Sequence, residues 1–143
     1  MSWDIVYYAP AGGEVPAHMF LDGCPTKVRA QMRATLDAVA EAPPPRFSGG
    51  GYWEAMKGKL AGYYEVRATG PKREQFRLFC ILENADRAEL TRRGLPRPAI
   101  AVIAGLRKPW MTAFGEADYE RIRAAGDAYL ANFPRRIVTE HPA

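Results

Sequence analysis

The chain has 143 residues, the length of one ordinary domain, and 48% of them are apolar while 25% are charged. This balance is typical of a folded globular protein and excludes a largely disordered chain. The 20 Lys and Arg against 16 Asp and Glu give a net charge of +4, a modest excess that favours anionic partners only where the cations cluster.

The first half of the chain predicts one strand and one long helix. Residues 5–8 are β-branched or aromatic and are followed closely by a proline and two glycines, which indicates a short first strand. Over residues 26–40 apolar side chains recur at helical spacing, with Thr26 placed to cap the helix and the prolines at 43–45 ending it. The apolar stripe of this helix consists of Val28, Met32, Leu36, Val39 and Ala40.

The second half predicts three strands, over residues 63–68, 76–82 and 100–106. The link at 69–74 is short enough for a hairpin, whereas the link at 83–98 is longer and rich in arginine. Both links favour an antiparallel meander in this order. Within the first of these strands Glu65 and Arg67 alternate with apolar residues, so they face away from the side that carries those residues.

The last predicted element is a helix that begins after Gly115, has Glu116 and Asp118 in its first turn, and ends before Pro134. Acidic residues suit the positive end of a helix dipole, and the apolar residues of this segment form one stripe. Residues 134–143 follow the helix and are expected to form a loose tail. All of residues 1–143 are assigned to a single domain.

Metal and membrane sites are not expected. Cys24 and Cys80 are the only cysteines and lie outside any C-x-x-C spacing, while His18 and His141 lie near the two ends. Neither a metal site nor a bound cofactor is therefore predicted. The N-terminus lacks the pattern of a signal peptide, and no run approaches the roughly 20 apolar residues of a membrane helix. We expect a cytoplasmic protein without a membrane partner.

Charged residues interrupt strands that otherwise consist of core residues. Glu65, Arg67, Arg77 and Arg107 come from the three predicted strands, and they are expected to share one face of the meander. A buried arginine must reach an anion, a carboxylate or water, because an unpaired charge in apolar surroundings is prohibitive. Two interpretations stay open: Glu65 forms a structural salt bridge with Arg67 or Arg77, or the arginines form a concave phosphate site.

Three segments in this order resemble the RelE/ParE-like toxin superfamily, and within it the phage-derived HigB-like branch. Residues 56–67 read MKGKLAGYYEVR and resemble the family's L-K-G followed by G-L-Y-E-L-R. Residues 76–79, FRLF, resemble its next strand, and residues 103–108, IAGLRK, resemble its last strand. The resemblance implies an α+β fold in which a small twisted antiparallel β-sheet packs against N-terminal helices. It also implies a C-terminal helix and an active site on the open face of the sheet.

The resemblance further implies a function. RNA-cutting members are toxins of type II toxin-antitoxin modules, ribosome-dependent mRNA endoribonucleases in which a ribose 2′-hydroxyl attacks the adjacent phosphate without a metal. By similarity, Arg77 binds that phosphate, Arg107 acts as acid or charge stabiliser, and Arg67 replaces one of two lysines. Arg92, Arg93 and Arg97 of the link at 83–98 are either solvated or join the RNA contacts. Further RNA contacts are expected from Lys57, Lys59, Arg73 and Lys108.

The chain departs from the family at the positions that move protons. Glu65 stands at the lysine position tied to the general base, as is usual in HigB-like members. The terminal catalytic tyrosine has no clear match, since Phe114 lies near its place and Tyr119 lies further into the helix. Neither histidine falls at a matching motif. Arginine is a poor base near neutral pH, so the base is open between Glu65, Lys57 and Lys59.

The expected partners are the ribosome, messenger RNA and a helix-turn-helix antitoxin. Two other functions stay open: a non-catalytic inhibitor of DNA gyrase, as on the ParE side of the superfamily, and an inactive phage-derived accessory protein. The arginines retained in the strands favour cleavage over the first of these. The missing tyrosine and histidine keep the second open.

Overall fold

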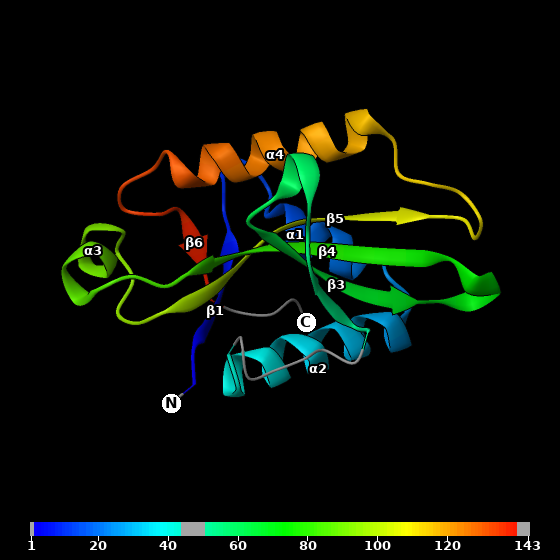
Figure 1. Ribbon diagram of the computed structural model, residues 1–143, viewed down its shortest axis with the longest axis horizontal. Helices are drawn as coiled ribbons and strands as arrows, with labels where there is room; N and C mark the ends of the chain where they lie inside the picture. The colour runs from blue at the N-terminus through cyan, green and yellow to red at the C-terminus, as the bar shows by residue number, and fades with distance from the viewer. Residues whose placement is uncertain (1, 44–50, 140–143) are drawn as a thin grey trace.

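The computed structural model describes residues 2–43 and 51–139, which have an α+β fold (Figure 1). The strands in this part of the chain are β1 (Asp4–Tyr8), β2 (Trp53–Ala55), β3 (Tyr63–Thr69), β4 (Gln75–Glu83), β5 (Ala99–Lys108) and β6 (Ile137–Val138). They form one mixed sheet in the order β2-β3-β4-β5-β1-β6. The helices are α1 (Pro16–Asp22), α2 (Thr26–Glu41), α3 (Arg87–Arg92) and α4 (Glu116–Leu130), with 3-10 turns η1 (Gly58–Leu60) and η2 (Pro71–Arg73).

The predicted meander is confirmed, because β3 pairs antiparallel with β4 and β4 pairs antiparallel with β5. The expectation of a wholly antiparallel sheet is wrong. β1 lies on the other side of β5 and runs parallel to it, with Asp4 opposite Ala99 and Tyr7 opposite Val102. This inner position suits β1, since Val6 and Tyr7 are buried in hydrophobic clusters on opposite faces of the sheet.

α2 confirms the predicted long helix and its apolar stripe. Its buried residues include all of Val28, Met32, Leu36, Val39 and Ala40. The expectation that Thr26 caps the helix is wrong: Pro25 is the N-cap residue, Thr26 is already helical, and no side-chain cap is formed. Together with α1, α2 covers one face of the sheet and packs there against Phe76 and Leu78.

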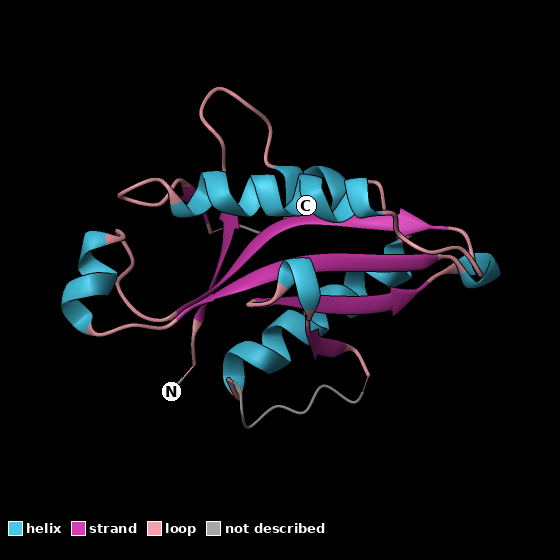
Figure 2. Ribbon diagram, turned by 45° about the horizontal axis from the view of Figure 1, so that its top comes forward, coloured by secondary structure: helices cyan, strands magenta, loops and turns pink. Residues whose placement is uncertain are grey.

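The opposite face of the sheet is only partly open, because α4 lies along it (Figure 2). α4 buries Ile122, Gly126 and Tyr129 and contacts β5 and η1. Its predicted start is confirmed, since the Asp118 carboxylate accepts a hydrogen bond from the N–H of Gly115 at 2.8 Å. The sheet therefore has a hydrophobic core on each face, and a site on the α4 side must lie where α4 leaves the strands accessible.

Local patterns missed three short elements, α1, α3 and β6. The loose tail expected from residue 134 onward is wrong for its described part, because Ile137–Val138 pair antiparallel with β1 as β6. Arg135, just before β6, is buried. Residues 140–143 of the predicted tail lie outside the described residues.

A buried carboxylate at the end of β4 holds this C-terminal segment in place. Glu83 is 1% exposed and accepts hydrogen bonds from the Tyr129 hydroxyl at 2.7 Å, from Arg135 Nε at 2.7 Å and from Arg93 Nη1 at 2.8 Å. Desolvation raises the pKa of Glu83, but the hydrogen bonds from Arg135 and Tyr129 outweigh it, and the pKa lies below its ordinary value. Glu83 of β4 therefore binds three other parts of the chain. These are α4 through Tyr129, the residue after α3 through Arg93, and the segment after α4 through Arg135.

Arginines of the link between β4 and β5 also form ion pairs with carboxylates. Arg92 and Arg93 both pair with Glu89, at 2.9 and 2.7 Å. Arg97 Nη1 lies 3.3 Å from Asp4 Oδ1. Arg93, which also pairs with Glu83 at 2.8 Å, and Arg97 join the link to β4 and β1, whereas the Arg92 pair lies within α3.

Candidate functional site

Glu65, Arg67 and Arg77 lie together on the face of the sheet that α4 partly covers. Arg67 on β3 and Arg77 on β4 are directly opposite each other, and Glu65 lies two residues before Arg67, on the same face. Glu65 Oε1 is 3.5 Å from Arg67 Nε, and its Oε2 is 3.8 Å from Arg77 Nε. The ion pairs of the structural interpretation are present, but both are longer than a normal hydrogen bond.

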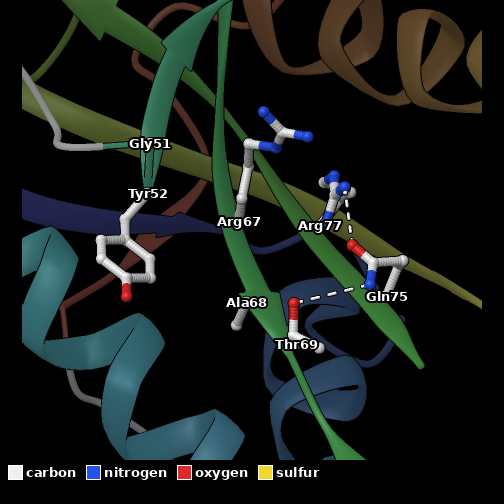
Figure 3. Close-up of a pocket in the computed structure, with 7 residues that line it drawn as sticks. All are labelled: Gly51, Tyr52, Arg67, Ala68, Thr69, Gln75 and Arg77. Atoms are coloured by element: carbon white, nitrogen blue, oxygen red, sulfur yellow. Dashed lines mark hydrogen bonds between the residues drawn. The ribbon is translucent and has the colours of Figure 1, made fainter. Parts of the chain in front are cut away.

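The Arg77 guanidinium is fixed by its own strand. Its side chain is 8% exposed, and it donates to the carbonyl of Phe76 at 3.0 Å and to Gln75 Oε1 at 3.0 Å. Gln75 in turn donates to the carbonyl of Arg73 at 2.9 Å. Figure 3 shows Arg67 and Arg77 side by side, projecting to the same side of the sheet. They border a hollow of about 220 Å³ that is also lined by Gly51, Tyr52, Ala68, Thr69 and Gln75.

Burial changes the proton affinities of these groups. Desolvation raises the pKa of Glu65, and Arg77 and Arg67 oppose this only in part. Desolvation and the neighbouring Arg67 lower the pKa of Arg77. Arg67 is 36% exposed and also pairs with Glu54 Oε1 at 3.1 Å. The site thus places a carboxylate of raised proton affinity between two cations, an arrangement suited to a general base beside an anion site.

Arg107 does not belong to this site, so the expectation that it shares a face with Arg77 is wrong. Its guanidinium lies 4.7 Å over the ring of Phe76, on the side of α1 and α2. There it donates to both carboxylate oxygens of Glu74, at 2.7 and 3.0 Å, and to the carbonyl of Gly23 at 3.0 Å. Arg107 therefore fastens the β3–β4 hairpin to the end of α1.

A β-bulge explains this reversal and brings Lys108 to the site instead. The register between β4 and β5 shifts between Phe79 and Cys80. An extra residue in one strand turns every later side chain to the opposite face, so Lys108 rather than Arg107 takes the α4 side. Desolvation, followed by the nearby Arg77, lowers the pKa of Lys108.

Tyr119 of α4 is a site residue that sequence reasoning left unplaced. Its ring packs edge-on against Phe79 and Phe114, at centroid distances of 6.3 and 6.1 Å. Desolvation and then the Glu65 carboxylate raise the pKa of Tyr119, whereas Arg77 lowers it, so this residue belongs to the same electrostatic cluster. Its position early in a helix was predictable, but only tertiary packing puts it over β4.

The other predicted RNA contacts lie on neighbouring turns. Lys59 of η1 pairs with Glu116 of α4, and this hydrogen bond raises the pKa of Lys59, which makes it a poor base. Lys57 is exposed at the start of η1. The guanidinium of Arg73, in η2, lies 4.5 Å over the ring of Trp110. Of the four predicted contacts, only Lys108 acts electrostatically on Glu65 and Arg77.

Comparison with protein-family models, with curated proteins and with solved structures found no match. Among residues 2–43 and 51–139, no group of three or more His, Cys, Asp or Glu residues is placed to hold a metal ion. In the same residues, no helix has the length and apolar character needed to cross a membrane. The function is therefore inferred from the geometry of the site and from the sequence resemblance.

Proposed function

We propose that this protein is a metal-independent endoribonuclease that cuts messenger RNA on the ribosome, as the toxin of a type II toxin-antitoxin module. The observation that supports this best is the pairing of Glu65 with Arg67 and Arg77, with Lys108 opposite Gln75 on the next strand. Guanidinium groups beside a hollow suit a phosphodiester, whose oxygens accept several hydrogen bonds at once. Helix-turn-helix antitoxin binding belongs to the same proposal.

Each group has a task in the attack of a ribose 2′-hydroxyl on the adjacent phosphate. Glu65 accepts the proton of the 2′-hydroxyl, which its raised proton affinity favours. Arg67 and Arg77 bind the phosphate oxygens and stabilise the charge that grows on them in the transition state. Lys108, whose pKa is lowered, protonates the departing 5′-oxygen.

The order of elements supports a RelE/ParE-like arrangement. Two helices, α1 and α2, precede the meander of β3, β4 and β5, and α4 follows it. The three segments that carry the sequence resemblance form η1 and β3, the start of β4 and the end of β5. They contribute all of the proposed catalytic groups, with Lys108 in the place that the resemblance gave to Arg107.

A Glu65→Gln variant tests the proposed base. Because burial raises the pKa of Glu65, the rate should fall with decreasing pH at values above the pKa of about 4.3 of an ordinary glutamate. The variant keeps the shape of the side chain, so we expect it to remain folded. It should lose cleavage, and any residual rate should no longer fall with decreasing pH in this range. Cleavage rates across pH and thermal unfolding measure the two effects. Loss of the fold would instead assign Glu65 to a structural salt bridge.

RNA cleavage is expected to require the ribosome. A free-standing ribonuclease generally uses a base and an acid with pKa values near neutrality, usually histidines, and no histidine lies among the described site residues. The ribosome can hold the message in a near-attack geometry that this small site does not enforce. Purified protein is incubated with a defined message, with and without programmed ribosomes, and the 5′ ends are mapped. Cuts at codon positions only with ribosomes are the expected result.

The same experiment, together with an assay of DNA gyrase, separates the alternatives. Equal cutting of naked RNA would reject ribosome dependence. No cutting in either case, together with inhibition of DNA gyrase, would move the assignment to a ParE-like inhibitor. No effect on either target would favour an inactive accessory protein. The observation that favours a non-catalytic role is that Glu65 forms ion pairs with Arg67 and Arg77.

A further inference from the structure

Backbone strain is concentrated at the end of the sheet where the β3–β4 hairpin meets the link from β5 to α4, at the right of Figure 1. Within the described residues, the non-glycine residues with positive φ are Lys72 at 57°, Arg73 at 59° and Met111 at 64°. This conformation is costly for residues with a Cβ and recurs at binding sites, where surrounding contacts maintain it. We refer to η2, Glu74 and residues 109–111 as the sheet tip.

The sheet tip presents an exposed tryptophan that is stacked on one side by a cation. The guanidinium of Arg73 lies 4.5 Å over the ring of Trp110. Trp110 is nevertheless 50% exposed, and the adjacent Met111 is 81% exposed. The indole borders a hollow of about 320 Å³ whose lining residues are Pro71, Lys72, Glu74, Pro109 and Trp110. An oriented, half-exposed indole beside a hollow is suited to a flat ligand.

The charge around this indole is positive. Lys72 and Arg73 lie in η2, and Lys108 lies two residues before Trp110 at the end of β5. Glu74, the acidic residue of the sheet tip, does not offset them, because an arginine of β5 binds both of its carboxylate oxygens. A half-exposed indole flanked by cations therefore lies at the sheet tip, two residues after Lys108.

We propose that the sheet tip binds a second nucleotide of the RNA strand, with its base stacked on the open side of Trp110 and its phosphate near Lys72 and Arg73. This inference rests on the RNA substrate of the proposed function. Aromatic rings beside cations are typical of single-strand binding, because a base stacks on the ring while its phosphate meets the cations. Two residues of chain span at most about 7 Å, so the backbone of Trp110 lies close to that of Lys108, which pairs with Gln75 beside the Arg77 site.

Binding of an uncleavable strand tests the sheet tip separately from catalysis. The probe is a fluorescent 2′-O-methyl decaadenylate, titrated with the intact protein at low salt and followed by anisotropy. Trp110→Ala is expected to weaken binding roughly tenfold or more, and Trp110→Phe, which keeps a ring, to restore most of the loss. Met19→Ala and Arg87→Gln change exposed residues of α1 and α3 and are expected to leave the affinity unchanged.

Unchanged affinity in Trp110→Ala would overturn the proposal. Preferential binding of a glutamate-rich peptide, abolished by Trp110→Ala, would also overturn it and would assign the sheet tip to a protein partner. Failure of the nuclease proposal looks different: the parent and Arg77→Ala would be equally inactive on programmed ribosomes. If Trp110-dependent binding of the uncleavable strand persisted in that case, the sheet tip would stand as an RNA-binding surface in its own right.

Discussion

Arg77→Ala is expected to lower the rate of ribosome-dependent cleavage roughly a hundredfold or more while the protein remains folded. The guanidinium is already fixed by the carbonyl of Phe76 and by Gln75, so it stabilises the transition state without first having to be ordered. Its truncation removes this donor and enlarges the hollow that the side chain borders. Glu65 keeps Arg67 as a partner, which limits the structural cost.

Arg107→Ala is the matched control, because it removes the same group from the neighbouring strand on the opposite face. It should cleave at nearly the parent rate and lose stability instead, since Glu74 and the carbonyl of Gly23 lose their donor. Single-turnover cleavage on programmed ribosomes and circular dichroism measure the two effects. The site would be assigned to the wrong face if Arg107→Ala abolished cleavage and Arg77→Ala did not.

Glu83→Ala is expected to lower the free energy of unfolding by about 3–5 kcal/mol. The substitution leaves the guanidinium of Arg135, whose side chain is 4% exposed, buried without its counter-charge. It also removes the acceptor of the Tyr129 hydroxyl and of Arg93 Nη1. The remaining hydrogen bonds of Arg135 go to backbone carbonyls near the end of α4, which carry no charge.

Urea denaturation of Glu83→Ala, with Glu89→Ala as control, measures this loss. Glu89 pairs with arginines at the surface, so its removal should cost far less. Because folding lowers the pKa of Glu83, its contribution is fully present above the ordinary value of about 4.3 and declines as pH falls through the folded pKa. The difference between parent and Glu83→Ala should therefore shrink in acid. A difference that did not change with pH would mean that packing, and not charge, holds the segment.

Periodicity was sufficient for the larger elements and insufficient for the smallest. α2 and the strands of the meander have apolar patterns long enough to be distinguished, and the structure confirms them. α1 and α3 are 7 and 6 residues long, so their patterns cover less than two helical turns. β6 has 2 residues and exists because Glu83 binds Arg135 nearby, a contact between distant segments that no local pattern contains.

Which residues share the site could be predicted from the sequence wherever successive side chains of a strand point to alternate faces of the sheet. Glu65, Arg67 and Arg77 share a face as expected, because β3 and β4 pair there without interruption. β5 contains the bulge, and because its residues there are apolar on both faces, the sequence pattern does not reveal the extra residue. Gly105 was the available signal: a Cβ there would lie 2.3 Å from the ring of Phe20, and an isolated glycine in a strand indicates a bulge or a close approach.

The parallel strand β1 makes this sheet slow to complete during synthesis. Asp4 pairs with Ala99 and Tyr8 pairs with Ile137, so a chain made from its N-terminus holds β1 without either neighbour until much later segments emerge. The β3–β4 hairpin, in contrast, can pair as soon as it has been made. Pairing between distant segments slows folding and leaves apolar strands exposed in the meantime. A nascent chain of this sequence is therefore expected to carry an ordered hairpin beside an unpaired apolar strand, which is the state that molecular chaperones bind.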